Sequence, residues 1–388
     1  MSKNSSIPYG RQFIDNADIK SINKSLRNDL ITTGSTVQEF EKSVKKYLNS
    51  RFVLSCNSGT SALNLAMLAM DVKHGDKIIM PTINFTAAAN IAKALGAKIY
   101  LADVNENSGQ MTKKTIEDCI KKNKLNKIKL LVTMYLGGLP HNVKDYYDLK
   151  KKYNFLILED ACHALGSKYF NGKKSHKIGS CHHCDVSTFS FHPLKSITTG
   201  EGGLISTNNK KIFDKSKLLR SHGMIKSNIK FNHKYDIIFS GHNYRLSDIN
   251  CALGLSQLKK INLFTKKRNT IARNYSKMLN NIPGIILNWK EEKKKYSSCH
   301  LYIILIDFSF FKTTRDKLME YLYKKGITTQ VHYIPLFKHS NFRYLNINQF
   351  NGTNNYYSKC LSLPIYYSLN LKDQKYIVKN IKKYLKII

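Results

Sequence analysis

The chain has 388 residues, of which 42% are hydrophobic and 11% aromatic, a composition typical of a globular protein with room for two domains. Its first residues lack the apolar core of a secretory signal, and no apolar run is long enough to cross a bilayer. The eight cysteines are scattered along the sequence. We therefore expect a cytoplasmic protein without a membrane partner.

The formal net charge is +37, because 63 lysine and arginine residues face only 26 aspartates and glutamates. Such a charge is compatible with nucleic-acid binding. The basic residues are spread over the whole chain, however, and no helix-turn-helix or other nucleic-acid module is recognisable. We expect no nucleic-acid partner, and a positive potential that attracts an anionic substrate.

Residues 15–48 have the apolar spacing of a helix. Short apolar segments then alternate with helical stretches. The predicted strands lie at residues 51–56, 77–80, 98–102, 129–134, 154–158, 186–191 and 203–206. Helices are predicted between them, among others at residues 60–70, 87–95 and 143–152. This alternation predicts an α/β fold with a mainly parallel sheet covered on both faces, whose ligands bind at the carboxyl ends of the strands.

A long helical stretch at 245–281 is predicted to close this first part of the chain. A strand, a helix, a second strand and a basic helix are predicted after it, at residues 302–307, 314–325, 328–333 and 372–388. We predict a large domain of residues 1–255, which includes the N-terminal segment, and a smaller C-terminal α/β domain of residues 256–388.

Lys195 stands between the predicted strand 186–191 and a glycine-rich turn at 200–203. Burial at such a place lowers the pKa of a lysine, so that its neutral amine can attack a carbonyl and form a Schiff base. Ser190 is close to Lys195 in sequence and carries a hydroxyl that could bind a phosphate.

The small residues 57–62 follow a predicted strand and open a helix. Backbone amides at Gly59 and Thr60 could hold a phosphate, because helix N-termini favour anions. An ordinary N-cap by Asn57 or Ser58 explains the same pattern.

Three further residues follow predicted strands. Asp160 ends a strand, and its carboxylate could keep a pyridine nitrogen protonated or could cap the next helical segment. Glu159 precedes it in the strand, so its side chain points to the opposite face of the sheet and is expected to have a structural role. His163 could bond a phenolic oxygen or be an ordinary loop histidine. Phe85 could stack on a flat cofactor, although such a residue more often belongs to a core.

The segment Cys181-His-His-Cys184 is similar to a metal-binding or redox motif. Four ligands within four residues cannot easily surround one zinc ion, and a redox pair usually opens a helix after a strand. We interpret it as a loop with incidental thiols and expect no metal.

Four motifs occur in order: Ser58-Gly-Thr-Ser61, Glu159-Asp-Ala-Cys-His163, Phe189-Ser-Phe-His-Pro-Leu-Lys195 and Thr198-Thr-Gly-Glu-Gly-Gly203. Together they resemble the DegT/DnrJ/StrS sugar aminotransferases, and the resemblance runs from Tyr9 to the C-terminus. It implies the aspartate-aminotransferase (fold type I) architecture, with a mainly parallel seven-stranded sheet, and the cofactor pyridoxal 5′-phosphate.

The resemblance also implies roles for the residues above. Lys195 would bind the cofactor covalently and move the proton, and Asp160 would bond the ring nitrogen. His163 stands where many relatives have glutamine, near the phenolic oxygen O3′, and Phe85 would stack on the ring.

The phosphate would be held by residues of both subunits. Gly59, Thr60 and Ser190 would contribute from one subunit and Asn243 from its partner. This implies a homodimer with shared active sites.

Within the family, Arg220-Ser-His-Gly-Met224 and Gln330-Val-His-Tyr333 are most similar to transaminases of pseudaminic acid biosynthesis. Those enzymes move the amino group of glutamate to C4 of a UDP-4-keto-6-deoxy-N-acetylhexosamine, and His332 and Tyr333 would line the sugar site. One alternative is an aminotransferase that acts on another nucleotide 4-keto sugar (bacillosamine, legionaminic or perosamine type). A second is a sugar dehydratase of the same fold, but those relatives have histidine in place of the lysine at position 195. A third is a DNA-binding regulator.

Overall fold

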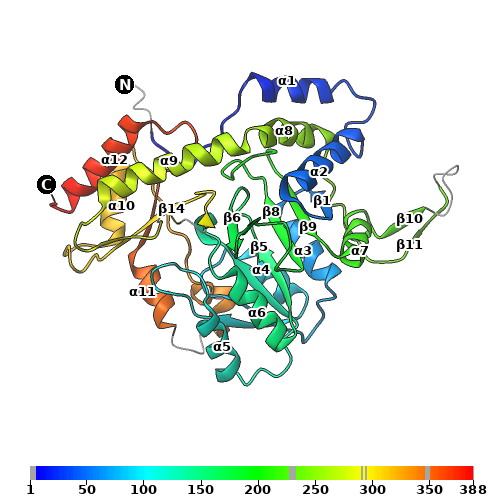
Figure 1. Cartoon of the computed structure of the whole chain (residues 1–388), viewed down its shortest axis with the longest axis horizontal. Helices are drawn as coiled ribbons and strands as arrows, with labels where there is room; N and C mark the ends of the chain where they lie inside the picture. Colours follow the sequence, from blue (N-terminus) through cyan, green and yellow to red (C-terminus); the bar gives the residue numbers. More distant parts are fainter. Residues whose placement is uncertain (1–5, 227–232, 290–291, 293–294, 346–349, 388) are drawn as a thin grey trace.

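The computed structural model describes residues 6–226, 233–289, 292, 295–345 and 350–387. Its centre is a seven-stranded sheet with the strand order β1-β9-β8-β5-β4-β2-β3 (Figure 1). Strand β9 runs antiparallel to its neighbours β1 and β8, and the other neighbours are parallel. The strands are β1 Phe52–Cys56, β2 Lys77–Pro81, β3 Lys98–Ala102, β4 Leu130–Met134, β5 Leu156–Asp160, β8 Val186–Ser190 and β9 Gly203–Thr207.

Helices cover both faces of this sheet, as the alternating sequence pattern predicts. Because successive side chains of a strand point to opposite faces, Leu131 of β4 enters one core while Leu130 and Val132 enter the other. One face is covered by α3 Gly59–Ala69, α4 Ala87–Ala94 and α7 Lys210–Arg220. The other is covered by α2 Ser35–Leu48, α5 Lys113–Lys122, α6 Val143–Tyr153 and α8 Asp248–Lys259.

The C-terminal part of the chain builds a smaller sheet. Its antiparallel strands are β12 Ile285–Leu287, β14 Tyr302–Ile306 and β15 Cys360–Leu363. A third core joins this sheet to α9 Ile261–Leu279, α10 Arg315–Lys324 and α12 Leu371–Tyr384. Helix α11 Asn351–Lys359 precedes β15. The third core also contains Ile7, so the N-terminal segment packs on the C-terminal part.

Three predicted elements differ in the structure. The helix expected at 15–48 is two helices, α1 Asn16–Ser25 and α2. The chain turns between them at Thr33, which has a φ of 59°. The buried carboxylate of Asp248 then accepts the amides of Gly34 and Thr36, at 2.7 and 3.0 Å, and so fixes the start of α2. The stretch 245–281 is likewise divided, into α8 and α9, at Lys260. The strand expected at 328–333 is reduced to one bridge between Gln330 and Ser362.

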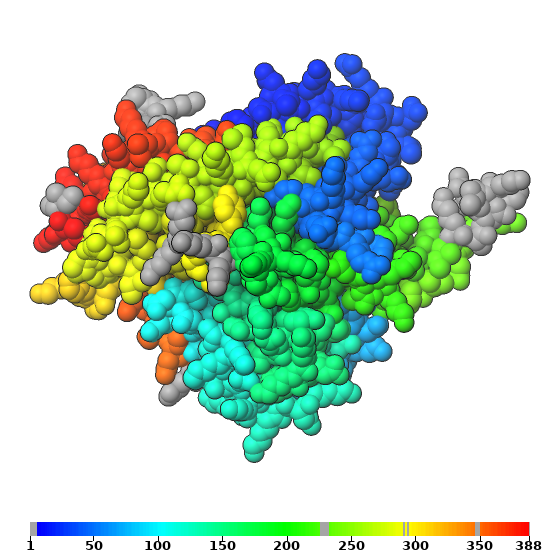
Figure 2. All heavy atoms as spheres, in the orientation of Figure 1, coloured from blue at the N-terminus to red at the C-terminus, as the bar shows by residue number. Residues whose placement is uncertain are grey.

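Two small antiparallel sheets were not predicted. One consists of β6 Lys168–Asn171, β7 Lys174–Lys177 and β13 Lys295–Tyr296, and the other of β10 Met224–Lys226 and β11 Tyr235–Ile237. The β10–β11 hairpin projects from the body of the molecule beside α7, as the space-filling view also shows (Figure 2). Within the described residues, no helix is long and apolar enough to cross a membrane.

Candidate active site

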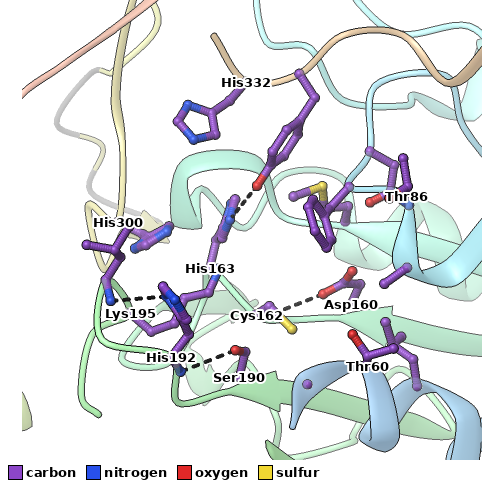
Figure 3. Close-up of a pocket in the computed structure, with 18 of the residues that line it drawn as sticks. Thr60, Thr86, Asp160, Cys162, His163, Ser190, His192, Lys195, His300 and His332 are labelled. Carbon is purple, nitrogen blue, oxygen red and sulfur yellow. Dashed lines mark hydrogen bonds between the residues drawn. The ribbon is translucent and has the colours of Figure 1, made fainter. Parts of the chain in front are cut away.

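A cavity of about 660 Å³ lies at the carboxyl edge of the central sheet (Figure 3). Met134, Asp160 and Ser190, which end β4, β5 and β8, reach its wall. The C-terminal part closes it with His300 and the residues 330–334. The cavity therefore occupies the position at which α/β sheets bind their ligands.

The predicted site residues gather around this cavity. Those that line it are Gly59, Thr60, Phe85, Asp160, His163, Ser190, Lys195, His332 and Tyr333. Asn243 does not line it: the residue is exposed, and its carbonyl oxygen lies 3.5 Å from Nδ2 of Asn57, next to the start of α3.

Lys195 is held in the turn after β8 by a hydrogen bond from its backbone amide to the carbonyl oxygen of His192, at 2.8 Å. Burial lowers the pKa of Lys195, although the nearby Cys162 and Asp160 act in the opposite direction. The neutral amine, which is the nucleophilic form, is thereby favoured.

Asp160 is buried, and its Oδ1 accepts the amide of Cys162 at 3.2 Å. Burial raises the pKa of this carboxyl group, partly offset by Cys162 and by Lys195. A cation bound opposite it would restore the carboxylate. Glu159 faces the other side of the sheet, where the hydroxyl of Tyr135 donates to its Oε1 at 2.6 Å, in agreement with a structural role.

The start of α3 meets the end of β8 at one corner of the cavity. Ser58 caps the helix by accepting the amide of Ser61 at 3.0 Å, so the N-cap interpretation holds for Ser58. A Cβ on Gly59 would lie 2.7 Å from the Cβ of Ser190, so only glycine permits this close approach. Thr60 and Ser190 therefore flank a helix N-terminus that is suited to an anion.

Phe85 is not a core residue, because 54% of its surface is exposed. Its ring lies on the cavity wall, 6.0 Å from that of Tyr333. An exposed aromatic ring in a cavity favours the stacking interpretation over the core interpretation.

Histidines also line the cavity. Nε2 of His163 shares a hydrogen bond with the hydroxyl of Tyr333 at 3.0 Å, and Nδ1 of His332 shares one with Oγ of Ser362 at 2.8 Å. Burial, together with the charge of Lys195, lowers the pKa of His332 to about 3 and that of His163 well below its usual value. Both imidazoles are therefore neutral.

Several cavity residues had not been predicted, among them Tyr9, Asn84, Glu201 and His300. Both side-chain polar atoms of Asn84 are buried and have no hydrogen-bond partner among the described residues. His300 lies two residues before the buried strand β14, whereas ligand residues are expected after the carboxyl ends of strands. A histidine two residues before a buried strand was the signal that could have indicated it.

The Cys181–Cys184 segment is a loop before β8. The Sγ of Cys181 donates to the carbonyl oxygen of Ser206 at 3.1 Å, and Nδ1 of His183 lies 2.6 Å from the hydroxyl of Tyr169. Among the described residues, no three histidine, cysteine, aspartate or glutamate side chains are placed to hold a metal ion.

The mainly parallel sheet with one antiparallel strand, the smaller C-terminal part and the lysine at the carboxyl edge define an aspartate-aminotransferase-like (fold type I) protein. The model of the DegT/DnrJ/EryC1/StrS aminotransferase family matches residues 12–382. The chain belongs to this family.

The chain is similar to a Campylobacter jejuni protein named UDP-4-amino-4,6-dideoxy-N-acetyl-beta-L-altrosamine transaminase, with 39% identity over 96% of this chain and 95% of the relative. The solved structure of Helicobacter pylori PseC, an aminotransferase involved in the biosynthesis of pseudoaminic acid, matches with a TM-score of 0.90 and 31% identity, over 99% of this chain and 100% of that one. The PLP-form of Spr1654, a putative sugar aminotransferase from Streptococcus pneumoniae, matches with a TM-score of 0.88 and 25% identity, over 98% and 99% of the two chains.

Proposed function

We propose that this protein is a pyridoxal-phosphate-dependent transaminase of pseudaminic acid biosynthesis. It would move the amino group of glutamate to C4 of a UDP-4-keto-6-deoxy-N-acetylhexosamine. The observation that carries the proposal is the meeting of Lys195 and Asp160 in one cavity with the α3 N-terminus. The names of the Campylobacter and Helicobacter relatives support the choice of substrate.

The cavity fits the cofactor chemically. Asn84 and His163 have buried polar atoms at its wall that lack a hydrogen-bond partner in the described part of the chain, and such atoms favour a polar ligand. Phe85 offers an exposed ring to a flat ligand, and the corner formed by Gly59, Thr60 and Ser190 suits a phosphate.

When bound, pyridoxal phosphate supplies the electron sink for the exchange of the amino group. Nζ of Lys195 would hold the cofactor and would move the proton from the α-carbon of glutamate. Asp160 would face the ring nitrogen, where a positive charge on that nitrogen would favour the carboxylate against the effect of burial. The neutral imidazole of His163 would orient the phenolic oxygen, and His332 and Tyr333 would border the space for the sugar.

The remaining proposals concern the assembly. We propose a cytoplasmic homodimer in which the exposed Asn243 of each subunit reaches the phosphate corner of the other, without nucleic-acid or membrane partners. We also propose that residues 1–255 and 256–388 are its two domains.

The test compares Lys195→Ala with Lys174→Ala, a change of an exposed lysine in β7. Each variant is incubated with glutamate and the UDP-4-keto sugar, and the product is identified by NMR. Loss of the nucleophile should lower turnover by at least about 10³-fold, whereas the control should remain active. Full activity of Lys195→Ala would disprove the assignment, and a faster reaction with a GDP-4-keto sugar would overturn the substrate.

A further inference from the structure

His300 is a buried histidine that the proposed reaction does not use. Only 7% of its surface is exposed, and it lies on the wall of the cavity (Figure 3). Its ring centroid lies 4.2 Å from that of His163, with 40° between the ring planes. It belongs to the C-terminal part of the chain, whereas His163 follows β5 of the central sheet.

The backbone around both rings is fixed. The buried guanidinium of Arg268 donates to the carbonyl oxygens of His300 and Ile365 at 3.3 and 2.9 Å. Oγ of Ser298 donates to the carbonyl oxygen of His163 at 2.6 Å, which ties the two segments together. The contact between the two imidazoles is therefore held from both sides.

His163 is confined by two neighbours. The ring of His300 packs against it, and the Tyr333 ring lies 6.0 Å away at an interplanar angle of 26°, with its hydroxyl on Nε2. Nδ1 of His163 and Nδ1 of His300 are buried without a protein hydrogen-bond partner in the described part of the chain. An unpaired buried nitrogen costs free energy unless a ligand completes it.

We propose that His300 is a positioning residue, whose ring packs on His163 and fixes the plane in which His163 presents a nitrogen to the phenolic oxygen of the cofactor. This inference rests on the proposed function, because it takes pyridoxal phosphate as the ligand of the cavity. Through His300, the C-terminal part of the chain would help to determine how His163 is oriented in the active site.

The charges around the pair agree with this role. Burial lowers the pKa of His163, and the charges of Lys195 and His332 lower it further. The pKa values of His163 and His300 both lie well below the usual histidine range. Arg268 also lowers the pKa of His300. Further titratable residues that line the cavity are Tyr9, Asp160, Cys162, His192, Glu201, Tyr333 and His339. Neutral rings each carry one N–H and one lone pair, so His163 acts as a directed hydrogen-bonding group rather than as a charge.

The test uses the holoenzyme and two variants. His300→Leu keeps the bulk but removes the flat ring, whereas His300→Phe keeps a flat ring without nitrogen. The measurement is the pH midpoint of the visible absorbance of the bound cofactor, together with the cofactor dissociation constant. A hydrogen bond donated by His163 to the phenolic oxygen favours the deprotonated form of the cofactor. If His163 is no longer oriented, this hydrogen bond weakens and the pH midpoint of the absorbance rises.

We expect His300→Leu to raise this midpoint by up to about one pH unit and to weaken cofactor binding up to about tenfold, the worth of one hydrogen bond. His300→Phe should stay near the wild-type values. Tyr333→Phe, which removes the hydroxyl on Nε2, should raise the midpoint in the same direction. Tyr302→Phe in β14 is the control, because its hydroxyl bonds Ser276 at 2.9 Å and does not line the cavity.

An unchanged midpoint in His300→Leu would overturn the inference. Equal shifts in the Leu and Phe variants would also overturn it, since His300 would then act through its nitrogen and not through ring packing. If the spectrum of pyridoxal phosphate did not change on addition of the wild-type protein, the proposed function itself would be contradicted.

Discussion

Asp160 and Lys195 lie on one wall of the cavity, and burial shifts their pKa values in opposite directions. Each shift favours the neutral form, and each residue partly opposes the shift of the other. The carboxylate of Asp160 raises the pKa of Lys195, so without this carboxylate the amine of Lys195 should lose its proton at a lower pH.

We therefore expect Asp160→Asn to move the pH dependence of covalent cofactor capture to lower pH. In the wild type the capture rate should climb with pH through the pKa of Lys195, below the ordinary lysine value of about 10.4. Stopped-flow absorbance of the cofactor-free protein mixed with pyridoxal phosphate measures this rate.

Glu159→Gln is the matched control for this experiment. Glu159 is the preceding residue of β5 and faces Tyr135 on the other side of the sheet, so its removal should leave the midpoint unchanged. A midpoint that moves upward in Asp160→Asn would contradict the electrostatic argument.

The residues of the site that the sequence predicted are those with a local signal. Asp160 and Ser190 end short apolar strands, and Lys195 precedes a glycine-rich turn. Asn84 follows β2 and had a local signal of the same kind, but it was not predicted. The signal at His300 was weaker, because its place in the cavity depends on how the C-terminal part packs over the sheet. Asn243 was predicted only through the family resemblance, and its role stays a prediction.

At the scale of elements, periodicity identified the strands of the central sheet to within about two residues. It failed where tertiary contacts decide. The break before α2 depends on Asp248, which lies far away in sequence. Residues 331–333 have the composition of a strand but turn into the cavity wall, and Gln330 alone pairs with Ser362.

The role of Asp248 can be measured as stability. Its carboxylate is buried and accepts the amides of Gly34, Thr36 and Val37 at the start of α2. Asp248→Ala removes these bonds and leaves the amides without a partner, so we expect the free energy of unfolding to fall by about 2–3 kcal/mol. Urea denaturation followed by circular dichroism measures the loss.

The control for this change is Asp214→Ala in α7. Asp214 forms an exposed i,i+4 ion pair with Lys210, and such pairs contribute little. The two aspartates should therefore differ clearly, and equal losses would show that the buried cap does not hold α2.

At the scale of the whole molecule, exposed apolar side chains cluster on two protruding elements. The β10–β11 hairpin and the residues after it expose Ile225, Tyr235, Ile237, Ile238 and Phe239. The N-terminal region around α1 exposes Ile19, Leu26, Leu30 and Ile31. Because contiguous exposed apolar surface marks interaction sites, both elements support the proposed homodimer.

A complementation experiment tests whether the dimer shares its active sites. In a shared site, Lys195 comes from one subunit and Asn243 from the other. A mixed dimer of Lys195→Ala and Asn243→Asp chains then has one site with both defects and one site with none. Asn243→Asp is chosen because a carboxylate repels the phosphate it would meet.

Neither variant alone should transfer the amino group at an appreciable rate. After joint unfolding and refolding in equal amounts, half of the dimers should be mixed and half of their sites intact, which restores about a quarter of the wild-type activity. If each site takes both residues from the same chain, every site in the mixture keeps one defect, and no activity returns. The recovered rate thus separates an Asn243 that crosses the interface from one that acts within its own subunit.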